Sequence, residues 1–271
     1  MQSAALRQYY ATRFPVEALV GLLTRGGALP LASRELAFQW NGGASFSRWR
    51  SFSTADELKE ALLREVPERV ELGAAYPGRA PTRDSPVLGR ELVFDFDLPD
   101  YDDLRTCPCK GGPKTARCAA CWRLLSSGAH GLEAVLRRDL GFERIVWVYS
   151  GSKGLHCWVL DESAFRLEER EREQLCSYLR GGARVLTATQ LELSGDERRP
   201  PRLDAKVTTV MSHLIKAPSA VHPVTKNVSV PLRCPQELDD PPALRADGPL
   251  EPLASRVALL VHSFQSLNGI L

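Results

Sequence analysis

The segment Glu91–Leu98, with the sequence ELVFDFDL, constrains the fold of this chain more than any other. Its large apolar residues alternate with Val93, Asp95 and Asp97, which is the two-residue period of a half-buried β-strand. The two aspartates therefore point to the same face, with their Cβ atoms about 7 Å apart. Carboxylates at that separation can share a pair of hard divalent cations. A solvent-exposed strand face explains the same pattern without any metal.

Patterns elsewhere predict an α/β protein. Helices are predicted at 5–12, 16–24, 55–64, 124–140, 163–180 and 251–267, and β-type runs at 145–149, 155–160, 202–210 and 228–232. Ser53 or Thr54 is the expected N-cap of the third helix. Residues 73–90 and 235–249 are rich in loop-forming residue types. With 271 residues, of which 44% are hydrophobic, we expect one compact body.

Charge and hydropathy restrict the location of the protein more than its function. The formal net charge is +2, which by itself does not indicate a nucleic-acid-binding protein. The sequence contains no apolar run of about eighteen residues, so we expect no membrane association. Its first residues lack the basic, apolar and small-residue order of a secretory signal. We therefore expect a soluble, intracellular protein.

Four of the seven cysteines lie close together in the sequence, at Cys107, Cys109, Cys118 and Cys121. In a chain without an export signal, such clustering favours a metal site over disulfides. Four thiolates at this spacing can hold zinc tetrahedrally, and a site closed in this way is structural. Four free cysteines are the alternative. The remaining cysteines are dispersed and predict no iron–sulfur centre: Cys157, Cys176 and Cys234.

The segment Ser150–Trp158, SGSKGLHCW, places two glycines, a lysine and a histidine at a turn between two predicted strands. Backbone amides and cations there could hold a triphosphate, although an ordinary hairpin turn needs the same glycines and serines. Downstream, RLD at 202–204 and HLIKAPSAVHP from His213 to Pro223 add a third carboxylate, a lysine and two histidines. Each residue is ordinary alone. Together they supply what a two-metal phosphoryl-transfer site needs beyond the D-x-D pair.

The order of these motifs resembles the small catalytic subunit of archaeal and eukaryotic primases, and the eukaryotic branch is closer. Three segments carry the resemblance: ELVFDFDLPDYDDLR, RIVWVYSGSKGLHCWVLDES and PRLDAKVTTVMSHLIKAPSAVHPVTKNVSVPL. The N-terminal YYATRFP, RELAF and ELGAAYP fit the opening of the same family. The resemblance implies an archaeo-eukaryotic primase core over 1–271, with mixed sheets flanked by helices. It also implies an active site between the sheets and an inserted zinc-binding loop at 105–122.

The resemblance assigns roles to individual residues as well. Two catalytic ions, magnesium or manganese, are expected on Asp95, Asp97 and Asp204. Contacts to the incoming nucleotide are expected from Ser150, Lys153, His156, Arg202, His213, Lys216 and His222. The family also uses an acidic residue and an arginine near its N-terminus to engage nucleotide, and Glu35 and Arg48 are similar to these in position.

The activity that the resemblance implies is the synthesis of short RNA primers. The 3′-hydroxyl of one ribonucleotide attacks the α-phosphate of the next on a single-stranded DNA template, and pyrophosphate leaves. The implied partners are a large primase subunit, which carries an iron–sulfur domain, and the DNA polymerase alpha complex. The implied location is the nucleus.

Three features depart from the family pattern. Ser152 and Lys153 stand where eukaryotic relatives present two basic residues, and the cysteine cluster begins with Cys-Pro-Cys instead of adjacent cysteines. Only roughly twenty residues, 181–201, replace a large helical insertion, so a helical accessory lobe is absent or minimal. The alternatives are a shortened, non-catalytic paralogue that binds nucleotide or the large subunit, a repair-type primase-polymerase that uses deoxynucleotides, and a metal nuclease.

Overall fold

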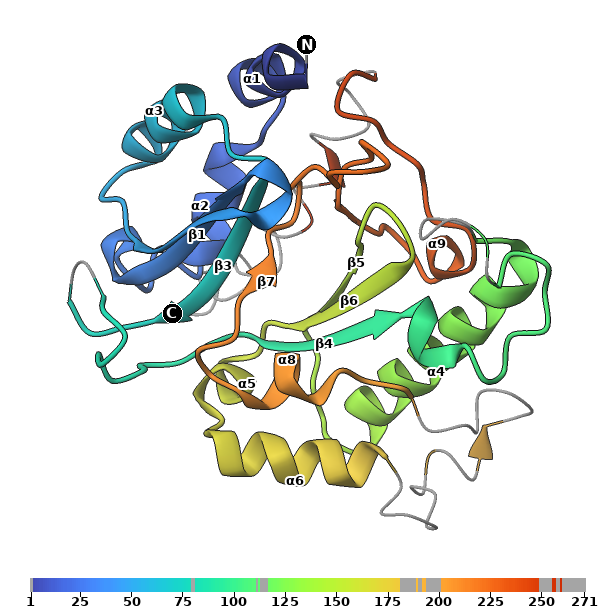
Figure 1. Cartoon of the computed structure of the whole chain (residues 1–271). Helices are drawn as coiled ribbons and strands as arrows, with labels where there is room; N and C mark the ends of the chain where they lie inside the picture. The colour runs from blue at the N-terminus through green and yellow to red at the C-terminus, as the bar shows by residue number, and fades with distance from the viewer. Residues whose placement is uncertain are drawn as a thin grey trace. The chain divides into compact units, whose positions relative to one another are not determined.

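The computed structural model describes residues 2–78, 81–110, 112, 117–180, 189, 192–193, 201–248, 255–256 and 259. The chain divides into two compact units (Figure 1). Unit 1 comprises Met1–Arg90, Ser212–Pro231 and Ala243–Leu271, and unit 2 comprises Glu91–Met211 and Leu232–Pro242. Antiparallel strands and helices in both confirm the α/β class. The assignment of 1–271 to one catalytic core with an inserted loop at 105–122 stays a prediction. No helix within the described residues is long and apolar enough to cross a membrane.

Unit 1 is built on an antiparallel sheet with the strand order β2-β1-β3-β7. Its elements are α1 (Gln2–Thr12), α2 (Val16–Leu23), η1 (Leu31–Ser33), β1 (Arg34–Trp40), η2 (Asn41–Gly43), β2 (Ser45–Arg50), α3 (Ala55–Glu65), β3 (Arg69–Ala75), β7 (Ile215–Lys216) and β8 (Val230–Pro231). The three helices predicted in this part of the sequence are confirmed. Thr54 is the N-cap of α3, because its side chain accepts a hydrogen bond from the backbone N–H of Glu57.

Unit 2 contains strands β4, β6 and β5, which lie side by side in that order and run antiparallel. Its elements are β4 (Leu92–Asp97), η3 (Leu98–Tyr101), α4 (Ala119–Arg138), β5 (Ile145–Tyr149), β6 (Gly154–Val159), α5 (Glu162–Arg166), α6 (Glu169–Leu179), α8 (Ala205–Thr209) and α9 (Gln236–Asp239). The predicted D-x-D strand and the predicted hairpin after it are both confirmed. On β4, Phe94 and Phe96 are buried, whereas Asp95 is half-buried and Asp97 is exposed.

The segment that contains α8 covers the outer edge of β4, and α8 lies between β4 and α6 (Figure 1). Alternate carbonyls of an edge strand point away from the sheet and need partners. Three such carbonyls accept hydrogen bonds: Glu91 O from the Arg172 guanidinium (3.4 Å), Val93 O from the Thr208 hydroxyl (3.0 Å) and Asp95 O from the Asp204 backbone N–H (3.3 Å). Residues 204–208 are therefore fastened alongside the D-x-D strand.

Two predicted elements were wrong. The β-type run at 202–210 contains helix α8 instead, because the Asp204 carboxylate caps it by accepting from Lys206 N at 3.0 Å. The helix predicted at 163–180 is two helices, α5 and α6. Leu167 between them is extended, and Glu168 starts α6 through a capping box with Glu171.

Other boundaries differ from the predictions. Strands β1, β2 and β3 were not predicted, and the loop expected at 73–90 begins inside β3. Helix α4 begins at Ala119, five residues before the predicted 124, and the loop expected at 235–249 contains α9. Only Val230–Pro231 of the run at 228–232 is strand. The helix predicted at 251–267 and the question of a lobe at 181–201 fall almost wholly outside the described residues.

Candidate active site

Asp95 lies in the middle of β4, directly opposite His156 of β6. Nε2 of His156 is 3.5 Å from Oδ1 of Asp95. The imidazole is buried, whereas 20% of the Asp95 side chain remains exposed. His156 therefore restricts one oxygen of this carboxylate, and the accessible part of the group can receive a cation.

Asp97 lies at the end of β4, over Gly154 of the neighbouring strand. A Cβ atom at Gly154 would be 2.3 Å from Oδ1 of Asp97 and 2.7 Å from the carbonyl oxygen of Phe96. Real Cβ atoms do not approach other atoms so closely, so this position requires glycine. The second glycine of the SGSKG turn thus makes the space that the Asp97 carboxylate occupies.

Asp204 is held next to β4 by its own backbone N–H, which donates to Asp95 O at 3.3 Å. Asp100, in η3, is a further carboxylate of this region that the sequence analysis did not single out. Burial and then the negative charge of Asp204 raise the pKa of Asp100. The charges of Asp100 and Asp204 therefore interact, although burial is the larger cause of the raised pKa.

The oxygen donors of Asp95, Asp97 and Asp204 are those that magnesium and manganese prefer. Asp97 and Asp204 are both exposed, so their carboxylates are accessible from solvent. The donor chemistry therefore fits the predicted ions. The assignment of these residues as ligands stays a prediction.

The turn between β5 and β6 is closed by its own serine. The Ser150 hydroxyl accepts from Gly154 N at 3.0 Å, and Ser150 N donates to Gly154 O at 2.9 Å. Gly151 has a φ of +86°, which favours glycine. Lys153 is half-buried, and its carbonyl accepts from Leu98 N at 3.2 Å. The turn that is predicted to bind phosphate is thus connected to Leu98, the residue directly after Asp97.

Arg202 is hydrogen-bonded to the chain that follows β4. Its guanidinium donates to both carboxylate oxygens of Asp103 and, at 2.9 Å, to Asp100 O. Its backbone N–H donates to the Tyr101 hydroxyl at 3.3 Å. These bonds fix the chain two residues before Asp204. The contact between Arg202 and nucleotide stays a prediction.

In unit 1, Glu35 of β1 and Arg48 of β2 form a bidentate ion pair, with N–O distances of 2.8 and 3.1 Å. Glu35 is fully buried, while a quarter of the Arg48 side chain is exposed. A Cβ atom at Gly73 of β3 would be 2.5 Å from Oε2 of Glu35. The Tyr76 hydroxyl also donates to Glu35 at 3.3 Å, and burial followed by this carboxylate raises the pKa of Tyr76 to about 12. The structure therefore brings the predicted pair together, with Glu35 inside and Arg48 outward.

Three other predicted residues lie in unit 1. Lys216 of β7 is buried and stands opposite Glu71 of β3, and His213 is half-buried three residues before it. Nδ1 of His222 accepts from the backbone N–H groups of residues 224 and 225, so a neutral ring carries its proton on Nε2. Burial and the charges of Lys216, Arg69 and Lys226 lower the pKa of His222 to about 4. Basic groups therefore surround a neutral hydrogen-bond donor, which suits an anion.

The four clustered cysteines meet in unit 2, with their Sγ atoms all within 4.8 Å of one another. A zinc ion 2.3 Å from four sulfurs in a tetrahedron would separate them by about 3.8 Å. Hydrogen bonding by Cys109 lowers the pKa of Cys107 to about 6 and the backbone N–H of Cys121 lowers that of Cys118, whereas burial raises the pKa of Cys121 to about 12. The cluster thus fits a structural zinc site closed by Cys107, Cys109, Cys118 and Cys121.

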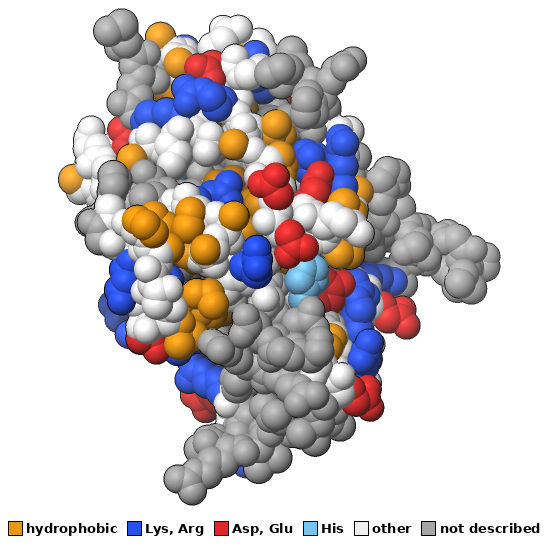
Figure 2. Space-filling view, turned by 90° about the vertical axis from the view of Figure 1, so that its right-hand side faces the viewer, with side chains coloured by type: hydrophobic (Ala, Val, Ile, Leu, Met, Phe, Trp, Pro, Cys, Tyr) orange, Lys and Arg blue, Asp and Glu red, His pale blue; other side chains and the backbone are white. Residues whose placement is uncertain are grey.

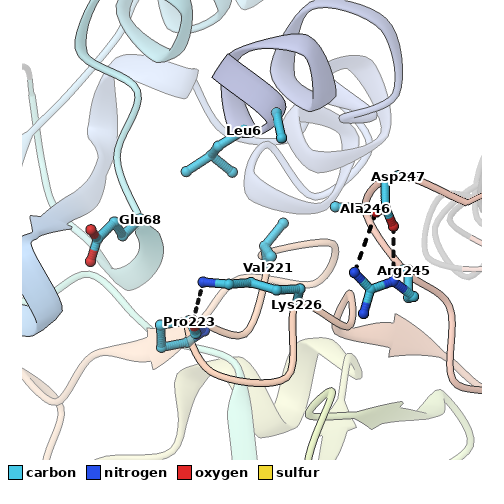
Figure 3. A pocket seen from close by; sticks show the side chains of 9 residues that line it. Leu6, Glu68, Val221, Pro223, Lys226, Arg245, Ala246 and Asp247 are labelled. Carbon is cyan, nitrogen blue, oxygen red and sulfur yellow. Dashed lines mark hydrogen bonds and ion pairs between the residues drawn. The ribbon is translucent and has the colours of Figure 1, made fainter. Parts of the chain in front are cut away.

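Unit 1 also contains a cavity of about 350 Å³ (Figure 3). Leu6 of α1 and Val221 line it, and its charged groups are already engaged, Lys226 with Pro223 O and Arg245 with Asp247. None of the predicted site residues lines it. Basic, acidic and hydrophobic side chains are interspersed on the face drawn in Figure 2, in keeping with the nearly balanced net charge.

Comparison with known proteins decides the family. The sequence profile described as DNA primase small subunit matches residues 94–234, which is more than half of the 271 residues. The chain belongs to the DNA primase small subunit family. It is 38% identical over 201 residues to the DNA primase small subunit of Schizosaccharomyces pombe, covering 69% of this chain and 43% of that protein. It is 30% identical over 226 residues to DNA primase small subunit PriS of Pyrobaculum calidifontis, covering 73% and 70%.

The primase-like fold is also found in a solved structure. The polymerase domain of Mycobacterium tuberculosis ligase D, in complex with DNA, superposes with a TM-score of 0.56 at 19% identity, covering 92% of this chain and 88% of that one. This confirms the expected core architecture. The chain spans less than half of the length of the yeast primase small subunits that it matches.

Sequence reasoning missed several residues that hold the site. Gly73 and Gly154 make room for carboxylates, and Thr208 fastens α8 to β4. Gly73 lay in a predicted loop, Gly154 was predicted only as part of a phosphate-binding or ordinary hairpin turn, and the threonine, in a β-type run, gave no signal. Asp100 could have been noticed as part of the acidic run after the D-x-D strand.

Proposed function

We propose that this protein is a nucleotidyltransferase that synthesises short RNA primers on single-stranded DNA. The observation that carries the proposal is the arrangement around β4. Asp95 and Asp97 share one strand face, Asp204 is fastened to Asp95 by its backbone, and the glycine turn lies across from Asp97. A carboxylate group beside a phosphate-binding turn is the arrangement that nucleotidyl transfer needs.

In the proposed reaction, a 3′-hydroxyl oxygen forms a bond to the α-phosphorus as the bond to pyrophosphate breaks, and the hydroxyl proton passes to solvent water. Two magnesium or manganese ions, when bound by the three aspartates, supply charge neutralisation and activate the hydroxyl. His156 restrains Asp95, and Gly154 leaves Asp97 in place. Ser150, Lys153 and His156 bind the triphosphate at the turn, so the leaving group is oriented by this chain.

Unit 1 contributes further nucleotide contacts in this proposal. Arg48 is a proposed nucleotide contact, and buried Glu35 holds its guanidinium in a fixed orientation. His222 donates from Nε2 to a phosphate or sugar oxygen, Lys216 adds positive charge, and His213 and Arg202 complete the predicted set. Zinc on the four cysteines has a structural role, since a closed thiolate site has no open position for chemistry.

The proposed partners follow from the family. A large primase subunit and the DNA polymerase alpha complex would bind this chain, and the template is single-stranded DNA. Ribonucleoside triphosphates are the substrates, and the nucleus is the location. This chain spans less than half of the length of the yeast relatives. The partners, template, substrates and location must therefore be tested on this chain itself.

The direct test is ribonucleotide incorporation on poly(dT) with ATP and Mn²⁺ or Mg²⁺, by this chain alone and with a large primase subunit. We expect short RNA products that disappear in the double variant Asp95→Asn/Asp97→Asn. Asp56→Asn is the matched control, because Asp56 is an exposed carboxylate in the first turn of α3. Its products should equal those of the wild type.

The same assay separates the alternatives. Preferential incorporation of dATP over ATP would indicate a repair-type primase-polymerase. Absence of product with intact ATP binding would indicate a non-catalytic paralogue, and degradation of the template would indicate a nuclease. Any of these three results would contradict the proposal.

A further inference from the structure

One aromatic and one cationic side chain, those of Trp122 and Arg117, connect the cysteine cluster with the interior of unit 2. Trp122 follows Cys121 and is almost completely buried, and Arg117 precedes Cys118. The Arg117 guanidinium lies 4.4 Å from the centroid of the Trp122 ring, which is cation–π contact. The positions of both side chains are therefore set by the backbone that carries the thiolates.

Both side chains pack against Tyr149, the last residue of β5. The Trp122 and Tyr149 rings meet edge to face with centroids 5.9 Å apart, and Arg117 lies 5.2 Å from the Tyr149 centroid. Tyr149 is 1% exposed. A ring enclosed to this extent cannot move without its neighbours.

The Tyr149 hydroxyl ends in the glycine turn, where it donates to Ser152 O at 2.9 Å. Further hydrogen bonds of the turn join Ser150 to Gly154 and Lys153 O to the backbone N–H of Leu98. Ser152 is itself buried. The tyrosine thus holds the middle of the turn, between the two ends that the backbone already fixes.

We infer that Tyr149 is a positioning residue that couples the metal-bound state of the cysteine cluster to the geometry of the nucleotide-binding turn. The inference rests on the proposed function, because the turn is assigned there to the triphosphate. Zinc fixes the backbone around Cys118 and Cys121, Arg117 and Trp122 clamp the tyrosine ring, and its hydroxyl orients the amides of the turn. The cysteine cluster then serves nucleotide binding as well as folding.

The test compares ATP binding by Tyr149→Phe and by wild type, using calorimetry in Mn²⁺ with zinc content measured on the same samples. Removing the hydroxyl leaves the ring but takes one hydrogen bond from a buried carbonyl, so we expect about 3- to 10-fold weaker ATP binding. Zinc content should stay at one ion per chain. In primer synthesis the KM for ATP should rise by the same factor while kcat changes less than about twofold.

The matched control is Tyr178→Phe, because the Tyr178 hydroxyl also makes one hydrogen bond, to Asp139, but on an exposed face of α6. Its ATP affinity should equal that of the wild type. Arg117→Met keeps all four thiols and removes only the clamp on the ring, and we expect a loss of about twofold.

The decisive part of the test is the measurement of ATP affinity after zinc removal. After chelation and dialysis, with folding checked by near-UV circular dichroism, wild type should lose ATP affinity by several-fold and Tyr149→Phe by much less. ATP affinity unchanged in Tyr149→Phe, or an equal loss on zinc removal in both proteins, would overturn the inference while leaving the proposed function intact. A zinc-loaded wild type that binds no ATP would overturn the proposed function, and the inference with it.

Discussion

Each unit places a strand carboxylate over a glycine of the neighbouring strand, but the two carboxylates differ in what neutralises them. In unit 1, Glu35 over Gly73 is fully buried and takes a bidentate ion pair from Arg48. In unit 2, Asp97 over Gly154 is exposed and has a second carboxylate, Asp95, on the same strand face. A carboxylate over a glycine thus holds an arginine in place in unit 1 and forms part of a candidate cation site in unit 2.

The difference follows from burial. A buried carboxylate needs a permanent partner, since an uncompensated charge in the interior is costly. A pair of carboxylates that solvent can reach can remain hydrated and exchange water for a divalent cation when one is present. The comparison therefore predicts that changes at Asp97 affect catalysis more than stability, and that changes at Glu35 affect stability more than metal binding.

The largest effect is expected for Gly154→Ala. The added Cβ would overlap Asp97 Oδ1 and Phe96 O, so either the carboxylate or the backbone of β4 must shift. A displacement of about 1 Å in a reacting group can reduce the rate roughly 100-fold, and we expect a loss of that size in primer synthesis. The Cβ added by Gly73→Ala would overlap the Glu35 side chain in the same way. We expect this variant to unfold at a lower temperature. Equal losses of activity in the two variants at matched stability would contradict the different roles given to Asp97 and Glu35.

Glu35→Gln should have the next largest effect. It leaves Arg48 without its charged partner, and because a quarter of Arg48 is exposed we expect about 2–3 kcal/mol of lost stability, below that of a fully buried pair. Urea unfolding measures this. Glu65→Gln is the matched control, since Glu65 forms a bidentate pair with Arg50 but both are about a fifth exposed. That variant should lose about 1 kcal/mol or less.

Thr208→Val tests how Asp204 is held beside Asp95. The valine keeps the shape and removes the hydrogen bond to Val93 O, which should cost about 1–2 kcal/mol and weaken Mn²⁺ binding a few-fold. Thr208→Ser restores the hydroxyl and should restore both. Thr209→Val is the neighbouring control, because Thr209 donates only to Ala205 O within α8. Loss of Mn²⁺ affinity in the Thr209 variant instead would contradict this role.

The smallest predicted effect is a loss of folding stability at low pH. The pKa of His222 is about 4 in the folded chain, below its ordinary value of 6.5. The unfolded chain therefore binds a proton between pH 6.5 and 4 while the folded chain does not, so stability falls as the pH is lowered through this window. For a half-buried ring we expect about 1 kcal/mol. His222→Gln should lack this part of the decline, and His213→Gln should keep it.

The sequence predicted the parts of the site that depend on local pattern. Strict alternation fixed the face of Asp95 and Asp97, and the glycines marked the turn before β6. The sheet of unit 1 could not be predicted in the same way. Strand β1 is buried on both faces over Arg34–Phe38, its pairing with β3 crosses more than thirty residues, and both of its pairings contain register shifts.

Tertiary contacts also outweighed local propensity in α8. Its Val207, Thr208 and Thr209 favour a strand, yet the Asp204 cap and the bonds to the edge of β4 stabilise a helix. Whether a carboxylate faces an arginine or solvent depends on which strands become neighbours. For that reason only the structure shows that Glu35 is buried against Arg48 whereas Asp97 is exposed.

The most direct test of the account is Mn²⁺ binding, followed by electron paramagnetic resonance, to wild type, Asp97→Asn and Glu35→Gln. We expect two ions per wild-type chain, loss of binding in Asp97→Asn and retention in Glu35→Gln under conditions where all three are folded. Unchanged Mn²⁺ binding in Asp97→Asn, or its loss in folded Glu35→Gln, would contradict the claim that the carboxylates of unit 2 hold the catalytic metals.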